Sequence, residues 1–405
     1  MNQSLCDQCV EHIFNQYYPF FCLTIEEISL IGTDSFPIPS FSCEQVQTLF
    51  LETHDTIKKQ GPLINVPLPA YIVGDIHGNF HDLLRVLLSI DDFLTKTIVF
   101  LGDYVDRGSY SLDVICLLFA LVCKYPSQFY LIRGNHEFEY VNSQYGFKNE
   151  IMERYGDDNL WVSVHKFVFN FLPLAALLNN SIICLHGGLG PNVTSIESIK
   201  KIKIPVSGYT VDDIVSDIVW SDPSNEYTTF INSTRGTGYL FGRLAVYEFC
   251  KNTNINKIIR GHQCVQHGVN TLSNGQIVTV FSSSNYSNRN NSAGFIYIDE
   301  KEEVHAKILH AIHFINRSDA IFTEVIPTPP VRKVDHSNSI SFMRLSSFKL
   351  SKSSFGPFNK TIGISSINNK SMYSGQGMKK QCFIPMPTSK SNGPEGCSIF
   401  PNLLD

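Results

Sequence analysis

The sequence predicts an α/β protein with a second, strand-rich sheet, preceded by helices and followed by an irregular tail. Between residues 66 and 325, short β-branched and apolar runs alternate with stretches of helical periodicity, which is typical of an α/β core. From about residue 257 onward the apolar runs follow one another closely, which indicates a second sheet. These observations divide the chain into residues 1–65, 66–325 and 326–405.

Residues 1–65 are expected to form one or more amphipathic helices. Apolar side chains recur there at helical spacing, namely Leu5, Cys9, Ile13 and Tyr17. Pro37 and Pro39 interrupt this pattern, and Gly61-Pro62 marks the approach to the core. We therefore expect a helical extension that ends before residue 66.

Residues 66–325 are expected to hold most of the strands and helices. The runs that we expect as strands are residues 70–73, 97–101, 128–132, 181–185, 257–259, 268–272, 276–281, 294–298 and 304–309. The runs that we expect as helices are residues 81–89, 112–124 and 161–171.

Residues 326–405 are rich in Ser, Asn, Pro and Gly and lack sustained periodicity, so we expect them to be disordered. They contain ten Lys or Arg against three Asp or Glu, a net charge of +7. Because the whole chain carries −5, residues 1–325 carry −12. The tail is either a solvated extension or a basic regulatory arm, and composition does not decide between the two.

Composition favours a soluble protein of the cytoplasm or nucleus. Hydrophobic residues make up 43% of the 405, enough to bury a large core. The eleven cysteines are scattered without a repeating spacing, which favours a reducing compartment over a disulfide framework. The first 18 residues lack signal-peptide order, and the most apolar run, 114–123, is far shorter than the roughly 20 residues of a membrane span. We expect neither a membrane nor a nucleic-acid partner.

Four short polar motifs follow expected strands directly. They are Gly74-Asp75-Ile76-His77-Gly78, Gly102-Asp103-Tyr104-Val105-Asp106-Arg107-Gly108, Gly134-Asn135-His136-Glu137 and His186-Gly187-Gly188. In an open α/β sheet, ligands bind beyond the carboxyl ends of the strands, so these side chains should lie close together. Carboxylate, imidazole and amide oxygen suit Mn, Fe or Zn, which predicts a metal site at these strand ends.

Each motif alone also has a simpler interpretation. The first could be a turn after a strand, the second a common loop sequence, and His186 a cap. Four such motifs at successive strand ends make coincidence an unsatisfactory explanation.

Together these motifs resemble the phosphoprotein phosphatase family of metallophosphoesterases, and within it the type 1 enzymes. The resemblance covers residues 66–309. It also includes Trp220-Ser-Asp-Pro223, Arg260-Gly-His-Gln263 and Ser284-Asn-Tyr286. It implies a metallophosphoesterase β-sandwich with flanking helices, a site for two metals at the carboxyl ends of the strands, and hydrolysis of phosphoserine and phosphothreonine in other proteins.

The resemblance also implies a role for each site residue. Asp75 and His77 would bind the first metal, Asp103 would bridge both, and Asn135, His186 and His262 would bind the second. Arg107 and Arg235 would grip the phosphate, and Tyr286 would line the substrate side. His136 would be the general acid, oriented by Asp106. Spacing alone leaves two alternatives open, His136 as a further ligand and Asp106 as an ion-pair partner of Arg107.

The implied mechanism is direct attack by a metal-activated hydroxide. Two divalent ions, Mn²⁺ or else Fe or Zn, would lower the pKa of a shared water. Arginine presents a planar fork that matches phosphoryl oxygens. His136 would then protonate the leaving alkoxide. The resemblance implies phosphoprotein substrates and regulatory subunits whose identity the sequence does not give.

Two other functions fit this sequence less well. Phosphodiesterases and nucleotide hydrolases of the superfamily carry a Gly-His-x-His motif, whose second histidine is absent from Gly261-His262-Gln263-Cys264. A non-catalytic binding module would have lost a ligand, and every expected ligand is present here. Both are weaker interpretations.

The chain also departs from the family pattern in two places. Residues 282–287 lack the usual proline and cysteine, which puts sensitivity to toxins in doubt. Residues 303–306 lack the aromatic residue of the type 1 docking groove, so we expect weak or altered docking of short hydrophobic motifs.

Overall fold

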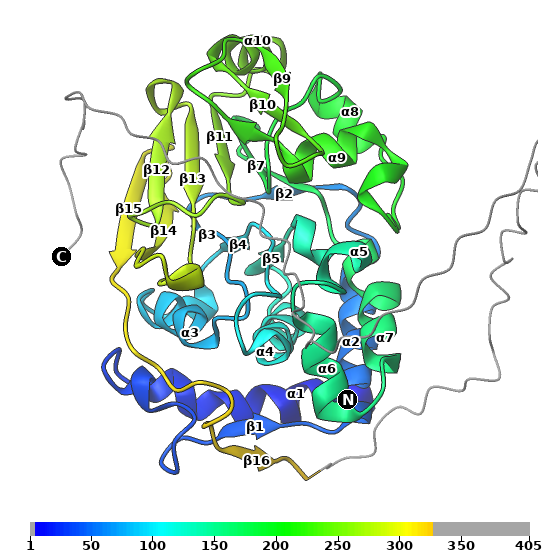
Figure 1. The fold of residues 1–405 in the computed structure, drawn as a ribbon, viewed down its shortest axis with the longest axis vertical. Coiled ribbons are helices and arrows are strands. Elements are labelled where there is room, and N and C mark those ends of the chain that lie inside the picture. The colour runs from blue at the N-terminus through cyan, green and yellow to red at the C-terminus, as the bar shows by residue number, and fades with distance from the viewer. Residues whose placement is uncertain (1–4, 327–405) are drawn as a thin grey trace, which may run out of the picture. The chain divides into compact units, whose positions relative to one another are not determined.

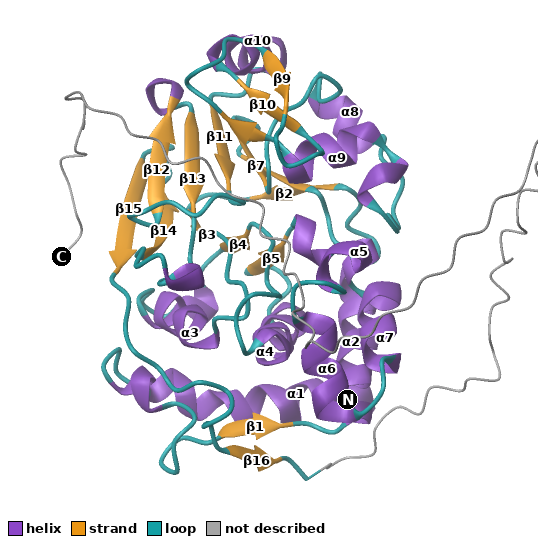
Figure 2. Cartoon of the chain, in the orientation of Figure 1, coloured by secondary structure: helices purple, strands orange, loops and turns teal. Residues whose placement is uncertain are grey.

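The computed structural model describes residues 5–326, and two β-sheets packed face to face form its centre (Figures 1 and 2). The five-stranded sheet has the order β15-β14-β3-β4-β5, and the six-stranded sheet the order β12-β13-β11-β7-β6-β2. Side chains from both sheets, including Ile72, Val99 and Ile259, form one buried apolar cluster between them. The predicted β-sandwich is confirmed.

The strands of the five-stranded sheet are β3 (Ala70–Val73), β4 (Ile98–Phe100), β5 (Phe129–Leu131), β14 (Ala293–Ile298) and β15 (Val304–Leu309). Those of the six-stranded sheet are β2 (Leu63–Val66), β6 (Ala175–Leu178), β7 (Ile182–Leu185), β11 (Lys257–Arg260), β12 (Val269–Leu272) and β13 (Ile277–Val280). All nine expected strands are present, with ends shifted by two residues at most. Strands β2 and β6 were not predicted from the sequence.

Parallel pairing brings the site-bearing ends of the strands to one place. In one sheet β3, β4 and β5 are parallel neighbours, and in the other β7, β11 and β13 are. An isolated bridge between Asp75 and Phe281 joins the segment after β3 to the segment after β13. The carboxyl ends of six strands from two sheets therefore meet.

Helices cover the outer face of each sheet. Six helices share one apolar core with the five-stranded sheet, with α1 and α2 packed on α4. They are α1 (Leu5–Tyr17), α2 (Cys43–Ile57), α3 (Phe80–Leu88), α4 (Ser111–Lys124), α6 (Phe147–Tyr155) and α7 (Asn159–Phe167). Against the six-stranded sheet pack α8 (Ile196–Lys200), α9 (Asp213–Trp220) and α10 (Arg243–Thr253). A short helix, α5 (Glu139–Asn142), and a small sheet of β8 (Asp222–Pro223), β9 (Phe230–Asn232) and β10 (Tyr239–Phe241) complete this part.

The expected helices are also present. Residues 81–89 and 112–124 correspond to α3 and α4, and residues 161–171 correspond to α7 followed by a short 3₁₀ turn at Phe169–Phe171. Helix α4 is buried around most of its circumference, as its almost uninterrupted apolar sequence requires. No helix among residues 5–326 combines the length and the apolar character that a membrane span needs.

The N-terminal helices share the core of the rest. Cys9, Ile13 and Tyr17 are buried in the same apolar cluster as α4. Strand β1 (Ile38–Ser40) pairs in parallel with β16 (Phe322–Glu324), which the sequence analysis did not predict. The proposed domain boundaries stay predictions, and the tail from residue 327 lies outside the described residues.

Candidate active site

Polar side chains gather where the strands of the two sheets end. Asp75 and His77 follow β3, Asp103 follows β4, Asn135 and His136 follow β5, His186 follows β7 and His262 follows β11. Each of them is between 0% and 8% exposed. Burying so many polar groups together is costly unless they have hydrogen-bond partners or a bound cation, so the cluster is a candidate functional site.

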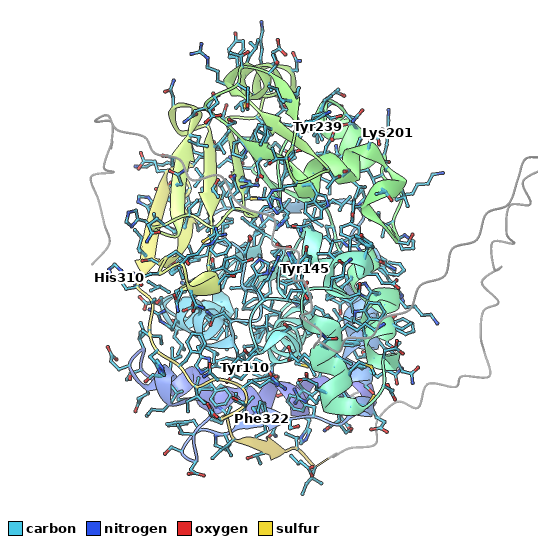
Figure 3. All side chains as sticks on the ribbon, viewed as in Figure 1. Tyr110, Tyr145, Lys201, Tyr239, His310 and Phe322 are labelled. Atoms are coloured by element: carbon cyan, nitrogen blue, oxygen red, sulfur yellow. The ribbon has the colours of Figure 1, made fainter. Side chains whose placement is uncertain are left out.

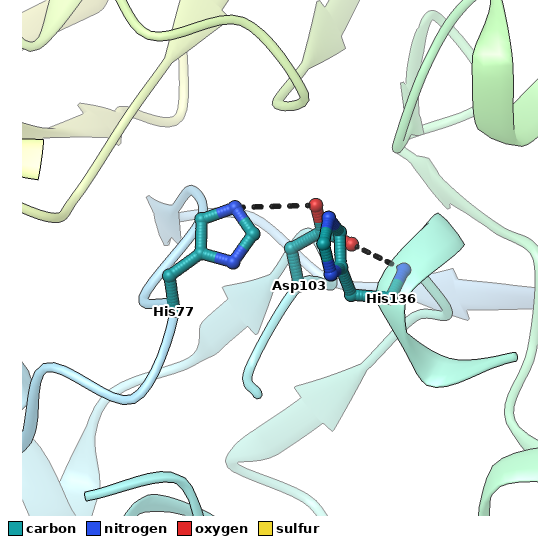
Figure 4. A group of neighbouring side chains, drawn as sticks. All are labelled: His77, Asp103 and His136. Atoms are coloured by element: carbon teal, nitrogen blue, oxygen red, sulfur yellow. Dashed lines mark hydrogen bonds and ion pairs between the residues drawn. The ribbon is translucent and has the colours of Figure 1, made fainter. Parts of the chain in front are cut away.

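The carboxylate of Asp103 lies at the centre of this cluster. Its Oδ2 is 3.5 Å from His77 Nε2 and 3.3 Å from His186 Nε2. Figure 4 shows Asp103 between His77 and His136, whose backbone N–H donates to Asp103 Oδ1 over 2.9 Å. Asp103 is thus placed to bridge two ligand groups.

The two ligand groups lie on either side of Asp103. On one side, His77 Nε2 is 3.8 Å from Asp75 Oδ2. On the other side, His186 Nε2 is 2.8 Å from Asn135 Oδ1 and 3.2 Å from His262 Nδ1. The ligand atoms of Asp103, His186 and His262 all lie within 4.8 Å of one another. The ligand atoms of His77, Asp103 and His136 also lie within 4.8 Å of one another, and the assignment of six ligands to two metals stays a prediction.

Backbone carbonyls orient two of the imidazoles. His77 Nδ1 bonds to Val105 O over 3.0 Å, and His186 Nδ1 bonds to Leu101 O over 2.9 Å. A carbonyl can only accept, so Nδ1 carries the proton and Nε2 faces the cluster, as is usual behind a metal-binding histidine.

The protonation properties of the cluster fit cation binding. Burial raises the pKa of Asp75 to about 7 and lowers the pKa of His77 to about 3. Burial also tends to lower the pKa of His186, but the adjacent Asp103 carboxylate outweighs it and raises that pKa to about 9. The negative charge of Asp103 therefore favours a proton on His186, and a bound divalent cation would compensate the same charge. The donor set suits Mn, Fe or Zn.

His136 and Asp106 form a short hydrogen-bonded pair beside the cluster. His136 Nδ1 is 2.6 Å from Asp106 Oδ2, and the N–H of Phe147 donates to Asp106 Oδ1 over 2.9 Å. Burial tends to lower the pKa of His136, but Asp103 and Asp106 together raise it. Both oxygens of Asp106 are thus engaged. The guanidinium of Arg107 instead lies 4.0 Å from the Tyr145 ring centroid.

The predicted phosphate-binding residues lie around this centre. Arg107 is exposed beside it. Arg235 Nε donates to Asp222 Oδ2 over 2.7 Å, and Asp222 Oδ1 accepts from the buried Arg260 Nη2 over 2.8 Å. The Tyr286 ring stacks on His77 with centroids 5.0 Å apart, and burial raises its pKa to about 12, so the phenol keeps its proton.

A cleft of about 310 Å³ opens beside the centre. It is lined by His77, Arg107 and residues of the 283–288 and 312–316 segments, Tyr286 among them. A phosphorylated side chain could therefore reach Arg107 from solvent.

Three supporting residues were quoted within motifs but given no role by the sequence analysis. Glu137 Oε2 accepts the N–H groups of Asp103 and Gly134 over 2.8 and 2.9 Å, and its Oε1 accepts that of Tyr104 over 2.8 Å. Asp222 and Arg260 hold Arg235 as described above. All three are charged residues beside strands, and that position is the signal that could have identified them.

Glycine is required where the loops cross. Gly102 has a φ of +98°, and a Cβ added there would lie 2.3 Å from Gly134 N. Only glycine combines that conformation with so close an approach, which brings the Asp103 and Asn135 loops together.

Comparison with known proteins agrees with this site. Residues 68–266 match the model of the calcineurin-like phosphoesterases. The chain is 37% identical over 290 residues to the serine/threonine-protein phosphatase 4 catalytic subunit of Saccharomyces cerevisiae, covering 70% of this chain and 91% of that protein. It is 36% identical over 265 residues to the serine/threonine-protein phosphatase 6 catalytic subunit of Caenorhabditis elegans, covering 64% and 77%.

A solved structure gives the same result. A protein serine/threonine phosphatase from Saccharomyces cerevisiae superposes with a TM-score of 0.63 at 26% identity, covering 72% of this chain and 98% of that one. The nearer likeness to type 1 enzymes stays a prediction, since the relatives named here are of types 4 and 6. The chain belongs to the phosphoprotein phosphatase family of serine/threonine protein phosphatases, within the calcineurin-like metallophosphoesterases.

Proposed function

We propose that this phosphatase hydrolyses phosphoserine and phosphothreonine at the Asp103 centre, using the residues that the sequence analysis assigned. The single observation that carries this proposal is the position of Asp103, which lies between two separate ligand groups and beside the His136–Asp106 pair.

The ligand groups are suited to two divalent cations. Asp75 and His77 would hold the first, Asn135, His186 and His262 the second, and Asp103 both. When bound, the two cations would lower the pKa of a shared water and supply hydroxide near neutral pH. We propose Mn²⁺, with Fe or Zn as alternatives, on the mixed oxygen and nitrogen donor set.

The substrate phosphate would lie between the two arginines. Arg107 and Arg235 would donate to the phosphoryl oxygens, and charge-assisted bonds of this kind are stronger than neutral ones. Arg260 and Asp222 would fix the direction of Arg235. The protonated phenol of Tyr286 can donate a hydrogen bond to the phosphate.

The leaving group would be protonated by His136. Asp106 fixes Nδ1 and stabilises the imidazolium, which leaves Nε2 to deliver a proton to the serine or threonine oxygen. Hydrolysis would then release the alcohol and inorganic phosphate without a covalent intermediate.

The position of Gln263 supports a monoesterase over a phosphodiesterase. Its Oε1 accepts from Arg260 Nη1 over 2.9 Å, so it supports the arginine network that holds Arg235. An arginine that binds the phosphate, as proposed for Arg235, suits a phosphate monoester, because a monoester carries more negative charge than a diester.

We further propose regulatory subunits, with altered docking at β15, and a cytoplasmic or nuclear location. In β15, His305 and Ala306 occupy the positions at which we noted the loss of the docking aromatic. Seven cysteines from Cys22 to Cys264 in the described part of the chain are free thiols, which supports a reducing compartment.

Turnover of two substrates in parallel tests the function. The purified protein with Mn²⁺ is assayed on a phosphoserine peptide and on an aryl phosphodiester, with His136→Ala as the variant. We expect preference for the peptide and a loss of roughly 10²- to 10⁴-fold in the variant, the range of general acid catalysis. Preference for the diester, or equal peptide turnover by the variant, would contradict the proposal.

A further inference from the structure

The segment between β15 and β16, residues 310–321, is here called the strap. Figure 1 shows it running from the end of β15 past α3 and α4 to β16. Arg85 Nη2 donates to His310 O over 2.6 Å, and the Phe314 ring stacks on His81 with centroids 4.6 Å apart. Tyr110 Oη donates to Ile315 O over 2.6 Å. The strap is therefore fixed along α3 and the start of α4.

Arg317 is the charged contact of the strap with the helices. Its Nη1 lies 2.8 Å from Asp113 Oδ2, 3.1 Å from Ser109 O and 3.3 Å from Glu150 Oε1. Tyr110 and Phe322, both labelled in Figure 3, flank the guanidinium with ring centroids 5.7 and 4.7 Å away. One guanidinium thus contacts the loop before α4, the first turn of α4 and the first turn of α6.

Glu150 joins the starts of these two helices. Its Oε2 accepts the N–H of Ser111 over 2.9 Å and its Oε1 that of Leu112 over 3.0 Å. These are N–H groups of the first turn of α4, which have no partner within the helix. The carboxylate belongs to the first turn of α6. Glu150 therefore sets the distance between the two helix starts.

Asp106 is held between the same two helix starts. Phe147, the first residue of α6, donates its N–H to Asp106 Oδ1 over 2.9 Å. The N–H of Asp106 donates to the hydroxyl of Ser111, the first residue of α4, over 3.1 Å. The other oxygen of Asp106 holds His136. A change in the spacing of α4 and α6 would move the carboxylate that orients the imidazole.

Arg317 compensates two buried carboxylates at this junction. The side chains of Asp113 and Glu150 are 1% and 8% exposed. Arg154 Nη1 also lies 3.1 Å from Asp113 Oδ1. Without Arg317, Glu150 would lose its ion pair while remaining beside the carboxylate of Asp113. The repulsion between the two carboxylates would favour protonation of Glu150. A neutral carboxyl group accepts weaker hydrogen bonds from the first N–H groups of α4.

We propose that Arg317 is a positioning residue for the dephosphorylation reaction. From the strap, it holds the starts of α4 and α6 at the spacing in which Asp106 orients His136. The inference rests on the proposed function of His136 as general acid.

The test separates leaving groups. When a phosphoserine peptide is hydrolysed, the leaving group is the serine alkoxide, a poor leaving group that must be protonated by the general acid. The leaving group of an aryl phosphate with an acidic phenol needs little protonation. In Arg317→Gln we expect kcat on the peptide to fall roughly tenfold, part of the 10²–10⁴ that an acid contributes, with kcat on the aryl phosphate within about twofold. KM should change little. Equal losses on the two substrates, or no loss, would overturn the inference.

A neighbouring arginine provides the matched control. Arg154→Gln removes a guanidinium that bonds to Asp113 and to Ser40 Oγ, on the side of β1. We expect it to change both substrates to the same extent. A leaving-group difference as large as that of Arg317→Gln would overturn the special role of Arg317. Should Arg317→Gln not fold, Arg317→Lys must show a smaller difference of the same kind, and equal losses would again overturn the inference.

A double variant distinguishes this inference from the proposed function. If His136→Ala itself shows no leaving-group difference, the acid assignment fails and the inference falls with it. If His136→Ala shows the difference, then adding Arg317→Gln should not enlarge it. Further enlargement would mean that Arg317 acts by another route and would refute the inference alone.

Discussion

The catalytic loops and the belt around the helices are built in opposite ways. The loops after β3, β4, β5, β7 and β11 bury carboxylates and imidazoles. The belt, by which we mean α1, the 3₁₀ turn Tyr18–Cys22 that follows it, β1, the strap and β16, contributes mainly apolar side chains such as Phe14, Tyr17 and Phe20 to the core. The first region concentrates polar groups, and the second concentrates apolar packing.

The backbone differs between the two regions as well. Several site residues have left-handed backbone conformations, with φ of +48° to +72°, namely His77, Asp103, Asp106, Arg107 and His262. Such residues cost on the order of 1–3 kcal/mol each and persist only where surrounding structure determines them. Part of that structure is aromatic packing, because Tyr17 and Phe20 contact Phe80, which begins α3 just after the His77 loop. Apart from Arg317, the belt therefore supports the His77 loop mainly through apolar packing.

The largest effect on turnover is expected from Asp103→Asn. An amide cannot supply the negative charge that two cations share, so we expect kcat to fall roughly a thousandfold, equivalent to about 4 kcal/mol, together with loss of bound metal. Metal content by elemental analysis and kcat on a phosphoserine peptide measure this. Asp92→Asn is the matched control, because Asp92 also has a left-handed conformation, with φ +49°, but is exposed and away from the site. Full metal content in Asp103→Asn would refute the bridging role.

A smaller effect is expected from Glu137→Gln. The Glu137 carboxylate accepts three backbone N–H groups from the Asp103 and Gly134 loops, and an amide must turn its NH₂ group toward at least one of them. We expect metal affinity to fall about 10- to 100-fold, the range for groups behind metal ligands. Metal titration followed by activity measures it, with the exposed Glu139→Gln as control. Unchanged affinity would show that the loops hold their geometry without this carboxylate.

The two regions also differ in how far the sequence predicted them. Every residue that was predicted as a ligand lies in the buried cluster, because each follows a strand whose apolar run is visible locally and which has at least one parallel neighbour. The pairing of β1 with β16 joins residues more than 280 positions apart, and no local pattern specifies such a partner. The role of Arg317 could not be predicted for the same reason, because its ion-pair partners Asp113 and Glu150 are distant in sequence.

The smallest effect on turnover is expected from Ile13→Ala in α1, and it tests whether the belt acts on chemistry apart from Arg317. Ile13 is fully buried, so its truncation should lower the free energy of unfolding by about 2–5 kcal/mol through lost burial and a residual cavity. Thermal unfolding measures this, with the exposed Asn15→Ala on the same helix as control. Well below the unfolding transition, kcat on the phosphoserine peptide should equal that of the unaltered protein, because the cavity lies in apolar packing and leaves the polar contacts of Asp106 in place. A fall in kcat in fully folded Ile13→Ala would mean that packing in α1 reaches the catalytic loops, and the separation drawn between the two regions would then be wrong.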